Sequence, residues 1–266
     1  MCLLRLKNPG FFLSAFGIVL GYVSSGLNRE SGKPGTPRVL VGIHQLHYVP
    51  WLRYFEKIAR SDVFIVLDNI QYNKNGWQNR NKIKSATGML TLTVPVLETF
   101  AQNLDEVRIR CDIPWRRKHW HSVRQFYAKA PFFSHYAGFL EHTWSQDWQM
   151  LNDLNRHMLP FFLGALGITT PVVYASDLNV PGIATDRLVN LIKAVGGDAY
   201  YSGTYATEAY LDAKSLQDAG IRTELQNWHA PVYPQLHGEF VPDLSIIDLL
   251  MNCGPDSLNV LMKGAE

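Results

Sequence analysis

The sequence predicts an α/β protein with a mostly parallel sheet and flanking helices, together with a helical middle region that forms a lobe or covering layer. Two observations support this prediction. Short runs rich in β-branched residues alternate with helical patterns in the first and last thirds of the chain, which is typical of parallel strands joined by helices. Residues 114–166, between these thirds, have helical periodicity.

The first third opens with a strand, a helix and a second strand, followed by a hairpin. The expected elements are a strand at 39–43, a helix from about 50 to 60, a strand at 63–67, a hairpin of 81–84 with 89–94, and a short strand at 106–110. Gly88 serves the hairpin turn, and Pro95 ends the second hairpin strand because proline cannot donate to a ladder.

The sequence pattern of the middle region predicts helices that are separated by a proline. Pro114 suits a first helical position, and Pro131 breaks the first helix. A third helix is expected to begin near Asp147, and Gly164 and Gly167 close it. Its buried face is formed by residues at three- and four-residue spacing, namely Trp148, Leu151, Leu154, Met158 and Phe162.

The last third returns to the alternation of strands and helices. The expected elements are a strand at 171–174, a helix at 185–195, strands at 199–201 and 221–225, and a helix at 245–251. Thr185 is the candidate cap of the first of these helices, and Gly196-Gly197 is its stop signal. Ser245 and Asp248 form a capping-box-like start for the second helix.

Composition limits the classes of function. The 266 residues are 47% hydrophobic and 18% charged, which suits one large domain or two small ones. A net charge of +2 gives no global attraction to nucleic acid or membrane, so we expect no nucleic-acid partner. The three cysteines have neither metal spacing nor a disulfide framework, which favours a reducing, cytoplasmic compartment and no metal site.

The N-terminus leaves the location open. Arg5 and Lys7 precede an apolar run at 11–23, which has the shape of a signal peptide and is short for a membrane-spanning helix. An export signal, a membrane-proximal anchor and an extension upstream of the true start all fit. We treat 1–37 as an N-terminal extension and 38–266 as the α/β domain, with a membrane partner only if the apolar run is real.

Polar residues follow four of the predicted strands. His44, Asp68, Ser202 and His229 each lie at or just beyond a strand end. In an open α/β sheet, ligands bind in the crevice outside the carboxyl ends of the strands, so these residues are expected to converge. His44 is the candidate catalytic base, and Asp68 is the second catalytic candidate. Alternatively, His44 is a loop histidine that caps the following helix.

Several loops carry residues suited to ligand binding. Trp77, Gln78, Asn79 and Arg80 combine an aromatic ring, two amides and a guanidinium, which suit sugars, phosphates and carboxylates. Gly203 lets the backbone approach a ligand next to Ser202, and two prolines stiffen the loop that carries Tyr233 and Gln235. The basic stretch 116–124 reads as a solvated helix face, or as a surface facing a nucleotide-sugar or anionic headgroups.

These motifs resemble those of the WbqC-like proteins over about residues 38–254. The matching residues are His44, Gln45, Tyr48, Pro50, Trp51, Asp62-Val63-Phe64, Trp77-Gln78-Asn79-Arg80, Tyr201-Ser202-Gly203, the run 229–235, Phe240 and the run 244–250. Leu46 replaces the usual proline and His47 the usual asparagine. His44 and His47 stand three residues apart in a loop with no completing ligand, so a metal is not expected there.

The resemblance implies a role in bacterial surface-polysaccharide assembly, with lipopolysaccharide O-antigen as the setting. It suggests an acyl or aminoacyl transferase, for example a glycyl transferase, that forms an amide on a nucleotide-linked amino sugar. The expected substrate-binding residues are Gln45, Tyr48, Trp51, Trp77, Gln78, Asn79, Arg80, Ser202, Gly203, His229, Tyr233 and Gln235. The rivals are an adenylating ligase that uses ATP and Mg²⁺, whose usual His-x-Gly-His motif is missing, and a non-catalytic nucleotide-sugar-binding protein.

Overall fold

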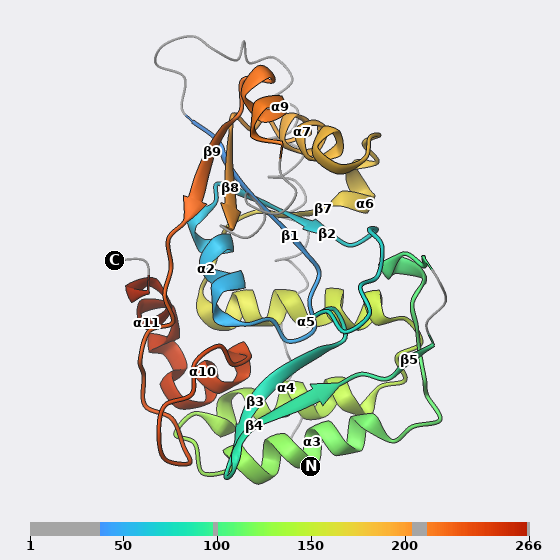
Figure 1. Ribbon diagram of the computed structural model, residues 1–266. Helices are drawn as coiled ribbons and strands as arrows, with labels where there is room; N and C mark the ends of the chain where they lie inside the picture. Colours follow the sequence, from blue (N-terminus) through green and yellow to red (C-terminus); the bar gives the residue numbers. More distant parts are fainter. Residues whose placement is uncertain (1–37, 98–100, 204–211, 265–266) are drawn as a thin grey trace, which may run out of the picture.

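The computed structural model describes residues 38–97, 101–203 and 212–264, and a parallel sheet dominates one half of it (Figure 1). The sheet has five strands in the order β7-β2-β1-β8-β9, all parallel to their neighbours. The strands are β1 (Leu40–Gln45), β2 (Val63–Leu67), β7 (Val172–Tyr174), β8 (Ala199–Gly203) and β9 (Arg222–Gln226). The prediction of an α/β fold with a mostly parallel sheet is confirmed.

Both faces of this sheet are covered, which explains its apolar runs. Side chains of β2 alternate between two cores: Val63 and Ile65 pack on one face, and Phe64 and Val66 on the other. The first face is covered by the upper helices in Figure 1, α6 (Ala175–Leu178), α7 (Ala184–Ala194) and α9 (Ala213–Asp218).

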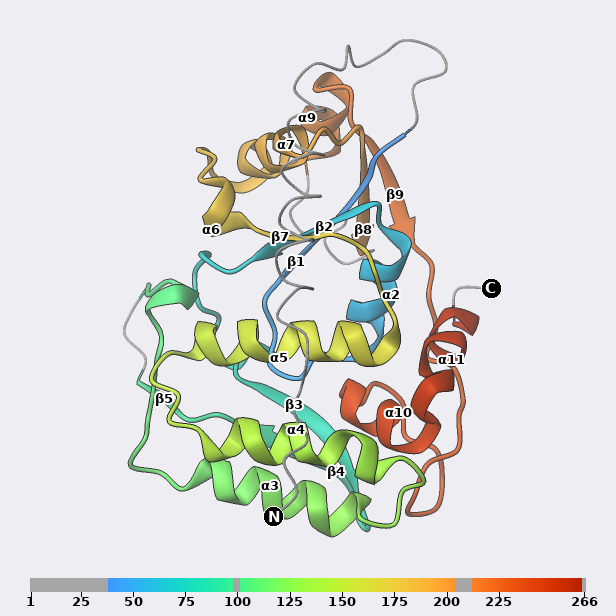
Figure 2. The same cartoon turned by 180° about the vertical axis from the view of Figure 1, so that it is seen from behind.

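The opposite face carries the larger core, which extends into the predicted helical middle region (Figures 1 and 2). Its helices are α2 (Leu52–Arg60), α3 (Trp115–Tyr127), α4 (Phe133–Ser145), α5 (Leu151–Leu166), α10 (Ile246–Cys253) and α11 (Ser257–Lys263). Its short elements are η1 (Leu104–Glu106), η2 (Gly254–Asp256) and the strands β3 (Arg80–Ser85), β4 (Gly88–Thr93), β5 (Val96–Leu97) and β6 (Arg108–Ile109). One continuous core joins these elements to the sheet, so the middle helices form a covering layer.

Local signals placed several elements well. The predicted hairpin is β3 paired with β4, and Gly88 takes a φ of 115° in the turn, where a side chain would be strained. Ser245 caps α10, as predicted, by accepting from the backbone N–H of Ile247. Gly167 ends α5 in the left-handed conformation.

Two predicted helix starts are wrong. The third middle helix, α5, begins at Leu151 rather than near Asp147, because Met150 is extended and forms a bridge with Arg108. Thr185 does not cap α7: the cap residue is Ile183, and the Thr185 hydroxyl instead accepts from the backbone N–H of Asp212. Tertiary contacts override the local signal in both cases.

The order of strands fixes where a ligand would bind. The chain builds β1, β2 and β7 in one direction across the sheet, and then returns to the other side of β1 for β8 and β9. The order therefore reverses between β1 and β8. The predicted extension at 1–37 lies outside the described residues, and within them no helix is long and apolar enough to cross a membrane.

Candidate functional site

The predicted strand-end residues lie along one edge of the sheet, because the strands that carry them are parallel neighbours (Figure 1). His44 is near the end of β1, Asp68 directly follows β2, and His229 is three residues past β9. Ser202 and Gly203 are the last two residues of β8 rather than a loop after it. The register of β1 with β8 ends at the pair of Gly42 with Tyr201, so His44 and Gly203 each lie two residues beyond the last pair, at the reversal point.

Two imidazoles form the centre of this region. The rings of His44 and His47 meet edge-on, with centroids 4.6 Å apart, and the Tyr54 ring lies 5.1 Å from the first and 5.6 Å from the second. His47 is buried, and its Nδ1 has no hydrogen-bond partner among the described residues. The buried hydroxyl of Tyr54 likewise has none within the described ranges. Such atoms are costly to bury and mark sites that a ligand can complete.

The tautomer of His44 is fixed by its neighbour. Nδ1 of His44 lies 3.2 Å from the carbonyl oxygen of Gln45, which can only accept, so Nδ1 carries the hydrogen. Nε2 of His44 is then left with a lone pair, as a general base requires. Burial, followed by the nearby His47 and Lys57, lowers the pKa of His44 well below its ordinary value, so the ring is neutral at physiological pH.

Lys57 joins these imidazoles from helix α2, and no sequence motif predicted it. Burial lowers its pKa from 10.5 to about 8, and its charge in turn lowers the pKa of His47, already depressed by burial, to about 3. A Cβ atom at Gly203 would lie 3.7 Å from Nζ of Lys57 and 3.9 Å from Oε1 of Gln226. We call His44, His47 and Lys57 the His–Lys cluster.

An aromatic pair and two amides flank the His–Lys cluster. The Trp51 ring packs 5.5 Å from that of His47 and 5.0 Å edge-on from that of Trp77, and both indoles are half-buried. Nε2 of Gln78 lies 3.4 Å from Oε1 of Gln45, which ties the predicted polar loop to the end of β1. The structure thus brings these four predicted residues together with His44.

Asn79 and Arg80 each have one buried polar atom without a partner among the described residues, as His47 and Tyr54 do. Asn79 is buried and donates to the carbonyl of Val94, while its Oδ1 has no partner in the described chain. Nε of Arg80 is also buried without a partner among the described residues.

Asp68 is occupied by structural contacts. Its carboxylate accepts from Arg156 at 3.0 Å and from both the backbone N–H and the hydroxyl of Ser176, and it is fully buried. The same guanidinium lies 3.8 Å over the Tyr174 ring. Asp68 therefore anchors α6 and α5 to the sheet in this structure, and its catalytic role stays a prediction.

Tyr48 also makes structural contacts. Its hydroxyl accepts from Nε1 of Trp144 at 2.9 Å and lies 2.8 Å from Nδ1 of His119. Nε2 of His119 in turn lies 3.1 Å from the carbonyl of Thr93, so this imidazole is buried although it belongs to the predicted basic helix face. The exposed part of that face is formed by Arg117, Lys118, His121 and Arg124.

The loop after β9 leads away from the His–Lys cluster. Tyr233 is buried and donates to Asp248, which also accepts from Tyr127 of α3. Gln235 exchanges two hydrogen bonds with the backbone of Val241 and so holds its own loop together. His229 is exposed, with its backbone N–H bonded to the carbonyl of Gly264. The structure does not gather these three predicted residues around His44.

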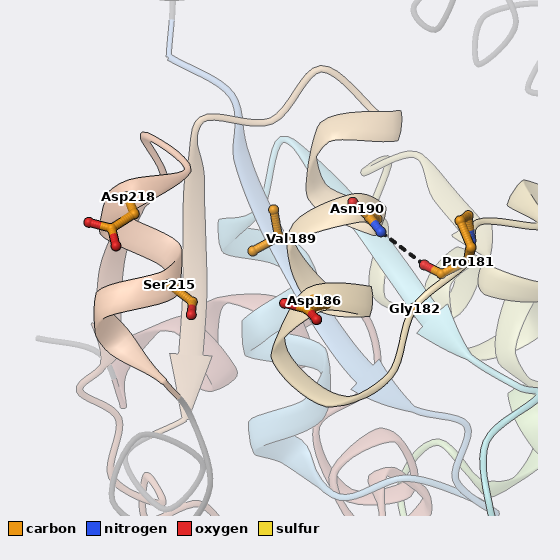
Figure 3. A pocket seen from close by; sticks show the side chains of 7 residues that line it. All are labelled: Pro181, Gly182, Asp186, Val189, Asn190, Ser215 and Asp218. Atoms are coloured by element: carbon orange, nitrogen blue, oxygen red, sulfur yellow. Dashed lines mark hydrogen bonds between the residues drawn. The ribbon is translucent and has the colours of Figure 1, made fainter.

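Metal ligands and surface hollows give a further view of the described chain. No group of three histidine, cysteine or acidic residues that could hold a metal exists within the described ranges, and the absence of a metal stays a prediction. An open hollow of about 520 Å³ lies between α7 and α9, lined by Asp186, Asn190 and Asp218 among others (Figure 3). These helices cover the sheet face opposite α2, and the Asn190 amide there is already bonded to the carbonyl of Pro181.

The order of strands and the helices on both faces of the sheet define a doubly wound α/β protein, a class whose ligands bind where the strand order reverses. The chain belongs to the WbqC-like protein family, whose sequence model matches residues 45–260. A relative from Mycobacterium tuberculosis, the Uncharacterized protein Rv1507c, is 34% identical over 225 residues, which cover 83% of this chain and 96% of the relative. No solved structure matches the chain.

Proposed function

We propose that this chain is a transferase that forms an amide on a nucleotide-linked amino sugar in bacterial surface-polysaccharide assembly. The observation that carries the proposal is the His–Lys cluster at the reversal point of the sheet. It places a neutral imidazole with a free Nε2 beside a cationic amine, at the edge where doubly wound sheets bind nucleotides. Membership of the WbqC-like family supports the same setting.

The chemistry assigns a role to each group. The amine of the sugar attacks the acyl carbonyl carbon, so a C–N bond forms while the bond from the acyl carbon to its carrier breaks. Nε2 of His44 accepts the proton that the amine loses and can return it to the departing carrier. The amide of Gln45 or Gln78 stabilises the oxyanion, and the Trp51–Trp77 pair offers a stacking surface for a base or sugar.

An adenylating ligase is the second candidate, because the cluster also suits a triphosphate. The two imidazoles beside the end of β1 and the Lys57 ammonium of α2 are suited to phosphate oxygens, and no acidic residue is among the groups that shift the pKa of either imidazole. Such an enzyme would first form an acyl-adenylate and release pyrophosphate. The sugar amine would then displace AMP.

One assay separates these possibilities. The full chain is incubated with a UDP-linked amino sugar and either glycyl thioester or glycine plus ATP, and the amide product and pyrophosphate are measured. Product from the thioester without ATP supports the transferase. Pyrophosphate release that needs both sugar and glycine identifies the ligase instead. Sugar binding without product from either donor would leave a non-catalytic binding protein.

A further inference from the structure

We propose that His44, His47 and Lys57 form a binding site for the phosphate groups of a nucleotide, and that this site takes up a proton when the anion binds. The inference rests on the proposed function for the choice of a nucleotide. The binding step itself requires no catalysis.

The position of the Lys57 ammonium is the first argument. Lys57 projects from α2 toward the end of β8, where a Cβ atom at Gly203 would lie 3.7 Å from Nζ, in ordinary contact. Gln226 lies opposite Gly203 in the register of β8 with β9, so an amide borders the same space. A ligand seated at the reversal point would therefore contact the ammonium directly.

The second argument is that this ammonium has no ion-pair partner among the described residues, although the charge of the nearby Glu56 carboxylate raises its pKa. Lys57 is 5% exposed and forms no ion pair or hydrogen bond with its side chain in the part of the chain that the structure describes. The adjacent carboxylate, Glu56, is committed elsewhere: it accepts from the Tyr201 hydroxyl and from Nε2 of Gln226, and it pairs with Arg60 at 3.3 Å. A buried cation without a partner is costly, and an anionic ligand would offset that cost.

The third argument is the set of donors around the ammonium. Nδ1 of His47 and the hydroxyl of Tyr54 are both buried without partners within the described residues, and His44 is half-buried beside them. The charged groups that act on the cluster are its own three members with Arg53 and Glu56 of α2. Phosphate oxygens can accept from an ammonium, an imidazole N–H and a phenol at once.

The proton uptake follows from the way that burial disfavours charge on the three side chains of the His–Lys cluster. Burial and mutual repulsion lower the pKa of His44 and of His47, the latter to about 3, while burial lowers the pKa of Lys57 to about 8. A bound anion favours the charged form of Lys57, whose pKa is the one near 8, so Lys57 takes up the proton while the His44 imidazole stays neutral. The proton must then come from the buffer, and affinity must fall as the pH rises through 8.

Calorimetric titration of the full chain with UDP tests this inference, with uridine and inorganic pyrophosphate as companion probes. Titrations at pH 8.5 in two buffers of different ionisation enthalpy should show uptake of about one proton for each UDP. The affinity should fall by up to about tenfold for each pH unit above 8. Pyrophosphate should bind with the same pH dependence, while uridine should bind at least about tenfold more weakly than UDP.

Two variants and a control sharpen the test. Lys57→Met should lower UDP affinity at least about tenfold at pH 7 and remove the dependence above pH 8. Gly203→Ala adds a methyl in ordinary contact with the ammonium, so the chain should fold and bind UDP more weakly. Lys118→Met, on the exposed face of α3, should bind like the wild type.

The inference is overturned by equal binding of uridine and UDP, by binding without proton uptake, or by wild-type affinity of Lys57→Met. Its failure can be told apart from failure of the proposed function. Amide formation with no proton uptake on binding would overturn the inference alone. Proton-coupled UDP binding with no product from any donor would overturn the transferase alone.

Discussion

Replacement of Lys57 with methionine should make the protein more stable at neutral pH. Folding removes water from this ammonium and supplies no ion pair for it among the described residues. Its pKa accordingly falls from 10.5 to about 8. At about 1.36 kcal/mol for each pKa unit, the fall corresponds to about 3 kcal/mol against the charged form. Methionine has a similar length and no charge, so the variant loses this penalty and keeps the packing.

The pH dependence provides the decisive assay. The unfolded chain holds the Lys57 proton up to about pH 10.5 and the folded chain only to about pH 8, so the penalty is full below pH 8 and fades toward pH 10.5. Urea unfolding followed by tryptophan fluorescence should show Lys57→Met gaining about 3 kcal/mol more at pH 7 than at pH 10.5. Lys118→Met should stay within about 0.5 kcal/mol of the wild type at both. A Lys57→Met variant less stable than the wild type at pH 7 would refute the reasoning, since it would show that the ammonium makes a stabilising contact.

Three further predictions follow from the same contacts. His44→Ala should lower amide formation by roughly two to four orders of magnitude with an unchanged melting temperature, and full activity would remove it as the base. Tyr48→Phe leaves the indole N–H of Trp144 without its acceptor and should lower the free energy of unfolding in urea by about 1–3 kcal/mol. Tyr54→Phe removes a hydroxyl that has no partner in the described chain and should leave that free energy unchanged. Equal losses of stability in the two variants would contradict this contrast. His47 and His119 have pKa values of about 3 when folded and about 6.5 when unfolded, so the unfolded chain binds more protons between these values. The free energy of unfolding should therefore fall by roughly 2 kcal/mol per histidine between pH 6.5 and pH 5, and a flat profile would show that these rings are not buried neutral.

The sequence predicted those parts of the fold that depend on neighbouring residues. Strand β2 has the predicted bounds, and the Gly88 turn and the Ser245 cap are where local chemistry placed them. The start of α5 could not be predicted, because the extended conformation of Met150 depends on a bridge to Arg108, forty-two residues earlier (150 − 108). A pairing over that distance leaves no local trace.

The parts of the candidate site that depend on neighbouring residues could also be predicted, and the parts that depend on long-range packing could not. A strand that ends in polar residues is visible in the sequence, so His44 and Gly203 could be named in advance. Lys57 could not be named, because Glu56-Lys57 looks like the solvated side of an amphipathic helix. The structure buries every α2 residue from Tyr54 to Ile58, because the helix lies between the sheet and α11. The packing of α2 against other elements therefore decides which of its charged residues lie next to His44 and His47.

The contrast between satisfied and unsatisfied polar groups then separates scaffold from site. Asp68 and Tyr48 were predicted to act on substrate, yet each has partners for its buried oxygen atoms. Tyr54, His47 and Lys57 are equally buried and lack such partners within the described ranges. The other buried atoms without a partner among the described residues lie on Asn79 and Arg80, at the start of β3, and on Asn152 and Asn155 of α5, whereas His47, Tyr54 and Lys57 gather beside the end of β1. These groups are therefore the ones we expect a ligand to complete, and their placement at the reversal of strand order says where that ligand enters.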